Sequence, residues 1–168
     1  YLNNPVRLLL AMCVLPLAGG ALACLSRGKH KSALRMLAVL LFGAANLFAA
    51  LALYLGGGAS GTLAFGAQGL EMRFAASGLS SLMLLFAAFM FLVVAVYAAS
   101  WFRTRENGGL YLLFLFISLS MLNGALMSDN LGILLFFWEG LLCTLFGILL
   151  IGRRENPKTA IKALALSG

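Results

Sequence analysis

Charged residues are scarce in this sequence, and acidic residues are the scarcest. Only 10% of the residues are charged, and five Asp and Glu stand against 12 Lys and Arg. A soluble domain has about a quarter charged residues and about half apolar residues. This chain is instead 62% hydrophobic, with a mean hydropathy of +1.02. The composition excludes a soluble globular domain and predicts an integral membrane protein.

Residues that bind cofactors are also few. The three cysteines, Cys13, Cys24 and Cys143, lie far apart in apolar runs, and no pair has the spacing of metal ligands. We interpret them as small buried apolar residues and His30 as a solvated loop residue. The chain has no haem-ligand pair, no cysteine cluster for iron–sulfur and no nucleotide-binding loop. We therefore expect no cofactor and no redox chemistry of its own.

The net charge of +7 does not indicate nucleic-acid binding, because the basic residues lie between apolar runs. In such positions they set the orientation of membrane spans. The basic intervals follow the first, third and fifth runs. Their Lys and Arg residues are Arg27, Lys29, Lys31 and Arg35, then Arg103 and Arg105, then Arg153, Arg154 and Lys158. This alternation predicts that the basic loops are cytoplasmic and that the N-terminus is outside.

Five apolar runs are long enough to cross a bilayer, which needs about 20 helical residues. They cover about residues 6–25, 36–55, 79–102, 110–127 and 130–151, and a sixth begins near 158. The predicted fold is an all-α polytopic membrane protein with a single membrane domain. For the first run, a signal peptide or a lipoprotein signal at residues 21–24 is the alternative, which its length and the following spans disfavour. Because the sixth run stops at Gly168, we expect this chain to be the N-terminal part of a longer subunit.

The longest polar interval, residues 56–78, separates the second and third runs. Residues 66–69 have the composition of a turn, and residues 70–74 alternate apolar and charged side chains, as a strand does. We predict a short hairpin at the membrane surface. Glu71 and Arg73 lie two apart on that strand, and we interpret them as a solvated pair.

Glu139 lies about ten residues from either end of the fifth run, near the expected bilayer midplane. A charge there costs on the order of 3 kcal/mol on insertion scales, and such a residue is read as functional by default. Asn46, inside the second run, has two interpretations: it hydrogen-bonds a neighbouring helix, which we prefer, or it binds an ion.

The residues around Glu139 predict which way it points. At about 100° per residue, one arc of the helix carries small residues beside the carboxylate. This arc consists of Gly132, Phe136, Glu139, Gly140, Cys143 and Gly147. Small residues let a second helix approach closely, so we expect this arc to face a helix bundle, with Gly132, Gly140, Cys143 and Gly147 packing around the carboxylate. Glu139 is then either a proton or ion relay, since desolvation disfavours the charged form of a carboxyl group, or a protonated residue that only ties two helices together.

Several segments resemble a known family. They are Leu70-Glu71-Met72-Arg73-Phe74, Gly78-Leu79-Ser80, Met127-Ser128-Asp129-Asn130-Leu131, Phe136-Phe137-Trp138-Glu139 and Ala160-Ile161-Lys162-Ala163. Together they resemble the antiporter-like, proton-conducting membrane subunits of respiratory complex I, membrane-bound [NiFe] hydrogenases, formate hydrogenlyases and multisubunit cation/proton antiporters. The resemblance covers about residues 65–168. One position departs from it: the family commonly has Asp before Gly-Leu-Ser, where this chain has Ser77.

The resemblance implies a function and partners. The members of this family contain inverted repeats of helices, and the Glu on their fifth helix pairs with a Lys on a later broken helix. By this resemblance, Glu139 corresponds to the Glu of the fifth helix. Lys162 matches a recurrent Lys at the start of the sixth helix, where snorkelling to the interface is the other interpretation. The implied partners are other membrane subunits of a redox complex, the lipid bilayer, and H⁺ or Na⁺, in the inner (plasma) membrane of a prokaryote.

Two functions therefore remain as hypotheses. In the first, the chain is an ion-translocating subunit of a redox-driven respiratory or hydrogenase complex, with Glu139 as its switchable carboxylate. In the second, it is a structural or assembly subunit, or a truncated paralogue, without a complete ion path. A freestanding enzyme is disfavoured, because no pair of catalytic groups converges in the sequence.

Overall fold

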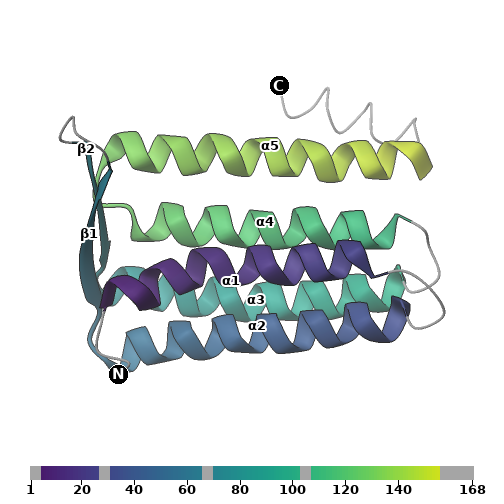
Figure 1. The fold of residues 1–168 in the computed structure, drawn as a ribbon, viewed down its shortest axis with the longest axis horizontal. Helices are drawn as coiled ribbons and strands as arrows, with labels where there is room; N and C mark the ends of the chain where they lie inside the picture. Colours follow the sequence, from purple (N-terminus) through teal and green to yellow (C-terminus); the bar gives the residue numbers. More distant parts are fainter. Residues whose placement is uncertain (1–4, 27–30, 66–69, 103–106, 156–168) are drawn as a thin grey trace.

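The fold consists of helices that lie side by side, with a hairpin at one end (Figure 1). The structure, a computed structural model, describes residues 5–26, 31–65, 70–102 and 107–155. Its elements are α1 (Pro5–Leu25), α2 (Lys31–Leu55), β1 (Ala59–Phe65), β2 (Leu70–Ala76), α3 (Gly78–Trp101), α4 (Gly108–Met127) and α5 (Leu131–Glu155). Successive helices run in opposite directions (Figure 1).

Four helices are long and apolar enough to cross a membrane, which agrees with a multi-pass membrane protein. They are α2, α3, α4 and the part of α5 from Leu131 to Ile151. The prediction of five complete spans is not supported. The apolar part of α1, Leu9–Leu25, is shorter than the roughly 20 residues that cross a hydrocarbon core. The predicted sixth helix, from about residue 158, lies outside the described residues.

Two helices extend beyond their apolar runs. α2 begins at Lys31 rather than near residue 36, and α5 continues through Arg153 and Arg154 to Glu155. Lys, Arg and Glu are good helix formers, so the helix continues where the apolar run has ended. Apolar runs therefore locate the spans better than they locate the helix ends.

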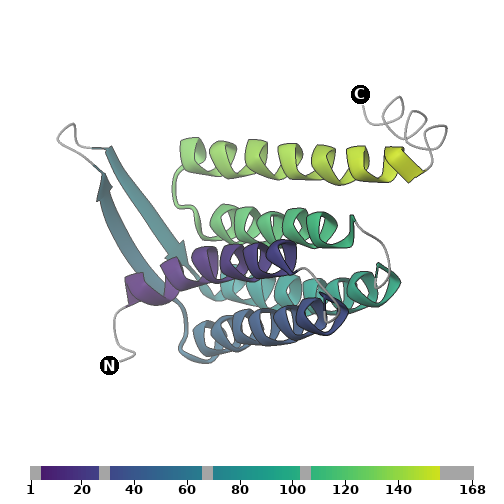
Figure 2. The ribbon, with the colours of Figure 1, turned by 45° about the vertical axis from the view of Figure 1, so that its right-hand side comes forward.

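Each helix has particular neighbours in the bundle. α1 packs against α4 and α2, and α3 packs against α2 and α4. α5 packs chiefly against α4 and lies at the edge of the bundle in both ribbon views (Figures 1 and 2). Most of the surface of α5 is consequently uncovered by the described helices.

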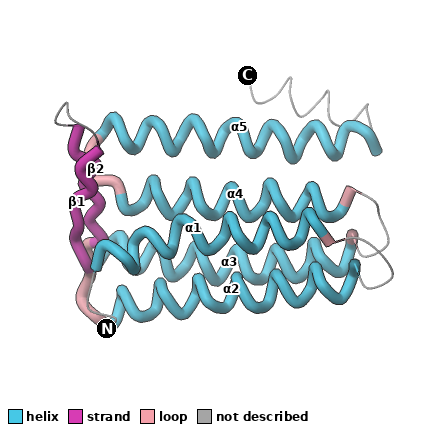
Figure 3. The backbone as a smooth tube through the Cα atoms, viewed as in Figure 1, coloured by secondary structure: helices cyan, strands magenta, loops and turns pink. Residues whose placement is uncertain are grey.

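The predicted hairpin is confirmed. β1 and β2 pair in antiparallel fashion from Ala59 opposite Ala76 to Phe65 opposite Leu70, and the predicted turn at residues 66–69 lies outside the described residues. The hairpin stands at one end of the helices (Figure 3). A bridge between Phe74 and Ser128 joins it to the turn between α4 and α5.

Ser77 occupies the N-cap of α3. Its side-chain oxygen accepts a hydrogen bond from the backbone N–H of Ser80 at 3.3 Å. Ser and Asp are both favoured N-cap residues, so Ser77 can cap this helix as an Asp at the same position would.

Candidate functional site

The helix that carries Glu139 begins at a side-chain cap. The side-chain oxygen of Asn130 accepts a hydrogen bond from the N–H of Gly132 at 2.9 Å. The carbonyl of Asn130 accepts one from the N–H of Leu134, also at 2.9 Å. The first bond satisfies an N–H group that the first turn of a helix leaves without a partner, and the second is the first backbone bond of the helix itself. The cap places Glu139 about two turns into α5, near the middle of Leu131–Ile151.

α5 packs on α4 through a single stripe of residues, spaced alternately four and three apart. The stripe consists of Ile133, Phe137, Gly140, Thr144, Gly147 and Ile151. This spacing keeps all six on one side of the helix, as in the seam of a coiled coil. The stripe defines which side of α5 the rest of the chain covers.

Glycines in the interface let large side chains of the facing helix come close. A Cβ added at Gly124 of α4 would collide with the ring of Phe137 of α5. A Cβ added at Gly140 of α5 would lie 2.7 Å from the sulfur of Met121 of α4. Small residues are typical of membrane helix interfaces, because packing rather than water exclusion drives association there.

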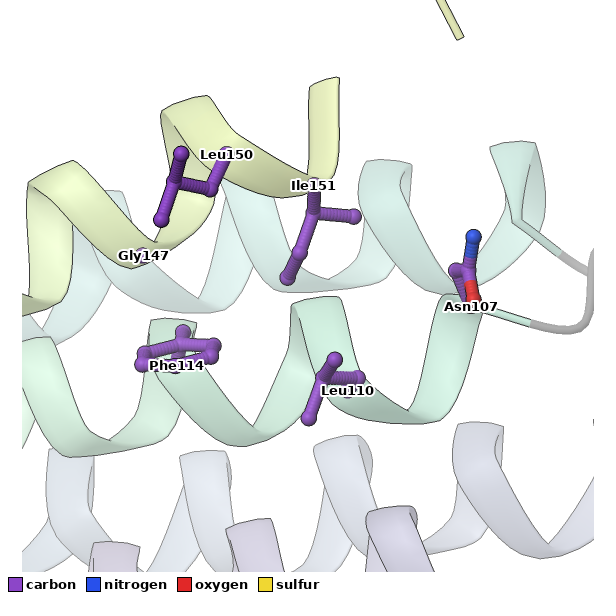
Figure 4. A pocket seen from close by; sticks show the side chains of 6 residues that line it. All are labelled: Asn107, Leu110, Phe114, Gly147, Leu150 and Ile151. Carbon is purple, nitrogen blue, oxygen red and sulfur yellow. The ribbon is translucent and has the colours of Figure 1, made fainter. Parts of the chain in front are cut away.

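The same pattern continues along the interface. Ser118 Oγ of α4 donates a hydrogen bond to Thr144 Oγ1 of α5 at 2.9 Å. One turn further, a Cβ at Gly147 would collide with the ring of Phe114. The interface ends in a pocket of about 200 Å³ (Figure 4), lined by Asn107, Leu110, Phe114, Gly147, Leu150 and Ile151. None of the described side chains that line this pocket is titratable.

Glu139 points away from this interface. With about 100° between successive residues, it lies roughly 120° from the centre of the packed stripe. Its side chain is exposed, as are Leu135, Trp138 and Leu142 around it. No hydrogen bond or ion pair joins Glu139 to the described residues. The carboxylate therefore sits among apolar side chains on the uncovered face of a membrane-spanning helix.

This arrangement corrects the predicted packing arc. Gly140 and Gly147 contact Met121 and Phe114 of α4, away from the carboxylate. The other members of the predicted arc, Gly132, Phe136 and Cys143, are exposed together with Glu139. The arc was placed by its small residues, but the packed stripe also contains the large residues Ile133 and Phe137. Lys162 lies outside the described residues, so its role stays a prediction.

The structure brings together a second polar group that the sequence predictions missed. Proline lacks an N–H, so Pro16 inside α1 leaves the carbonyl of Met12 without its usual helical donor. Asn123 Nδ2 of α4 donates a hydrogen bond to that carbonyl at 2.8 Å. Ser120 Oγ donates to the neighbouring carbonyl of Cys13 at 2.6 Å. The proline in an apolar run was the available signal, but nothing in the sequence indicated its partner helix.

Asn46 of α2 joins this group. Asn123 Nδ2 donates a second hydrogen bond, to Asn46 Oδ1 at 3.0 Å. The preferred interpretation of Asn46, a hydrogen bond to a neighbouring helix, is therefore confirmed. Both amides are buried, at 2% exposed for Asn46 and 0% for Asn123, and together they connect α1, α2 and α4.

Within the described residues, no group of three or more His, Cys, Asp or Glu side chains is arranged to hold a metal ion. No family model and no curated protein matches this chain.

Proposed function

We propose that this chain is an ion-translocating membrane subunit of a redox-driven respiratory or hydrogenase complex, in which Glu139 is the switchable carboxylate. The observation that carries this proposal is a carboxylate near the middle of a spanning helix, on the face that no described helix covers. Leaving such a group against lipid costs on the order of 3 kcal/mol or more. A covering helix with a polar or cationic partner removes that cost.

The uncovered face of α5 supports this proposal. α4 is the main neighbour of α5 within the described residues, so most of the circumference of α5 is open to a further membrane helix. A cationic partner close to Glu139 would favour the charged carboxylate, and its withdrawal would favour the neutral form. The proton or cation would be released or bound with each of these changes. The ion, H⁺ or Na⁺, belongs to the same proposal, since a carboxylate serves either.

A structural or assembly subunit is the second candidate, and the same exposed face favours it. Four large apolar side chains close to Glu139 in the sequence are exposed: Leu135, Phe136, Trp138 and Leu142. Such a face is an interface for another subunit whether or not the carboxylate changes its protonation. In this candidate Glu139 is protonated throughout and contributes one static hydrogen bond.

The experiment that separates the two is Glu139→Gln in the complete complex, in closed membrane vesicles. Ion uptake is measured together with the rate of the driving redox reaction. If Glu139 relays the ion, we expect coupled uptake to fall by on the order of 100-fold, the scale typical of removing a positioned proton-transfer group. The assembled complex should remain intact, because Gln keeps the shape and the hydrogen-bonding capacity.

Asp129→Asn is the matched control. Asp129 is exposed in the turn before α5, so the same loss of a carboxylate occurs outside the spanning segment. We expect full uptake in this variant. Full uptake in Glu139→Gln as well, with normal assembly, would reject the relay and support the structural function.

The membrane topology completes the proposal. We infer that α1, which lies alongside α4 (Figure 1), crosses as the fifth span although its described apolar part is short. The basic segments then lie in the cytoplasm and the hairpin lies on the outer side. The membrane in this proposal is the inner membrane of a prokaryote. The alternation of basic loops supports this orientation.

A further inference from the structure

The amide pair formed by Asn46 and Asn123 leaves hydrogen-bonding capacity unused. An Asn side chain offers two N–H donors and one carbonyl acceptor. Asn123 Nδ2 uses both of its donors, on the carbonyl of Met12 and on Asn46 Oδ1. Asn46 Nδ2 and Asn123 Oδ1 remain, and both atoms are buried without a hydrogen-bond partner. One is a donor and the other is an acceptor.

Buried polar groups in proteins are nearly always satisfied, by protein or by ordered water. The two amides share a hydrogen bond of 3.0 Å, so the two remaining atoms belong to one bonded pair in the same part of the bundle. Neither atom has a hydrogen-bond partner among the described residues. Ordered water is the other partner that buried polar groups use.

The chemistry of the two atoms selects the ligand. A cation would be repelled by the amide hydrogens of Asn46, and an anion would be repelled by the carbonyl oxygen of Asn123. Water accepts a hydrogen bond from Asn46 Nδ2 and donates one to Asn123 Oδ1, and buried waters typically make two to four such bonds. We propose that the Asn46–Asn123 pair binds water inside the helix bundle, beside the break that Pro16 makes in α1.

This water site is separate from the face that carries Glu139. Asn46 and Asn123 lie among α1, α2 and α4, whereas Glu139 lies on the uncovered side of α5. The inference does not depend on the proposed function, since a structural subunit would need the same water.

Radiolytic oxidation of buried methionines tests the proposal. A brief X-ray pulse on the protein in its membrane produces hydroxyl radicals from bulk and bound water, and radicals formed at a bound water oxidise the side chains next to it. Met12 and Met127 are the probes, because both are buried, at 1% and 0% exposed, in one cluster. Asn123 bonds the carbonyl of Met12 and lies one turn from Met127 on α4. Met121 is the reference, because it is on the same helix, is less buried and faces Gly140 of α5. We expect methionine sulfoxide to form several-fold faster at Met12 than at Met121, measured by peptide mass spectrometry. Rates at Met12 and Met127 that are both no higher than the rate at Met121 would overturn the proposal.

The double variant Asn46→Leu/Asn123→Leu gives the second arm, because it removes both unpartnered atoms. Asn46→Leu alone would also remove the acceptor of Asn123 Nδ2 and leave Asn123 with a further free donor. We expect the oxidation rate of Met12 in the double variant to fall to that of Met121. Ser118→Ala, which removes a polar group from the α4–α5 interface, is the control and should leave Met12 unchanged. An unchanged rate at Met12 in the double variant would also overturn the proposal. The comparison of Met12 with Met121 needs no variant, so it decides the question even if the double variant fails to fold.

Discussion

Two adjacent residues of α5, Glu139 and Gly140, have different surroundings. Gly140 lies against Met121 of α4, whereas Glu139 is exposed on the uncovered face. A step of about 100° along the helix separates them. At this scale the local structure is decided by which residues leave room for a neighbour, and Gly124, Gly140 and Gly147 each receive a large side chain.

Gly124→Ala tests this interlocking directly. Its new Cβ would meet the ring of Phe137, and overpacking of this kind costs about 1–3 kcal/mol. The preference of a helix for Ala over Gly, about 1 kcal/mol, offsets part of this cost, so we expect the free energy of unfolding in detergent to fall by up to about 2 kcal/mol. Phe137→Leu in the Gly124→Ala background should recover part of the loss, because the shorter side chain leaves room for the methyl group.

Gly132→Ala is the matched control on the same pair of helices. The nearest atom to its new Cβ is Asn130 Oδ1 at 3.6 Å, an ordinary contact. Ala is favoured over Gly in a helix by about 1 kcal/mol, so this variant should be as stable as the wild type or more stable. If Gly124→Ala were no less stable than Gly132→Ala, the described α4–α5 contact would be wrong.

Among the elements, α1 is held differently from the others. Its helical hydrogen bonding is interrupted at Pro16, and side chains of α4 bond the carbonyls of Met12 and Cys13. The side-chain N–H of Asn123 on α4 thus takes the place of the backbone N–H that would otherwise bond the carbonyl of Met12 within α1. The position of α1 in the bundle therefore depends on α4 as well as on apolar packing.

Pro16→Ala is expected to loosen this dependence. The new N–H at residue 16 can donate to the carbonyl of Met12 and so compete with Asn123. In a double-mutant cycle, the destabilisation caused by Asn123→Leu should be smaller in the Pro16→Ala background by about 0.6 kcal/mol, the average for polar contacts between membrane helices. Unfolding in detergent provides the four free energies.

Leu17→Ala supplies the background control for this cycle. Leu17 is on the same helix but is 39% exposed, and its N–H is present in both variants. We expect Asn123→Leu to cost the same with or without Leu17→Ala. A coupling with Leu17 equal to that with Pro16 would show that Asn123 responds to α1 packing in general.

In the whole molecule, polar groups gather at one level of the bundle. The contacts of Phe137 with Gly124 and of Gly140 with Met121 place Glu139 level with Asn123. Asn123 in turn bonds Asn46 and the carbonyl of Met12. The buried amide pair and the exposed carboxylate therefore lie at a similar depth, on opposite sides of the α4–α5 interface.

The proposed topology predicts which end of the molecule faces the cytoplasm. Single cysteines are introduced by Ser60→Cys in the hairpin and Thr104→Cys in the basic segment after α3, with Cys13, Cys24 and Cys143 replaced by Ser. A membrane-impermeant maleimide should label the first in intact cells and the second only after permeabilisation. This follows from the cytoplasmic preference of basic loops. The reverse pattern would place the N-terminus inside.

The amino-acid sequence is enough to locate the long apolar helices and the hairpin. Four spanning helices and the hairpin lie close to their predicted positions, because an apolar run and a polar, glycine-rich interval differ strongly in composition. The helix ends were less predictable, since Lys31 and Arg153 continue a helix as readily as an apolar residue does.

Which side of each helix is covered depends on how the helices pack in three dimensions. The spanning part of α5 has one charged residue, Glu139, among apolar residues on every side. Lipid is as apolar as a protein core, so an apolar side chain does not indicate which of the two it faces. Shape complementarity with α4 selected the stripe through Phe137, Gly140 and Gly147, and Glu139 was left outside it. The hydrogen bond between Asn46 and Asn123 likewise exists only because packing brings α2 and α4 together at these residues.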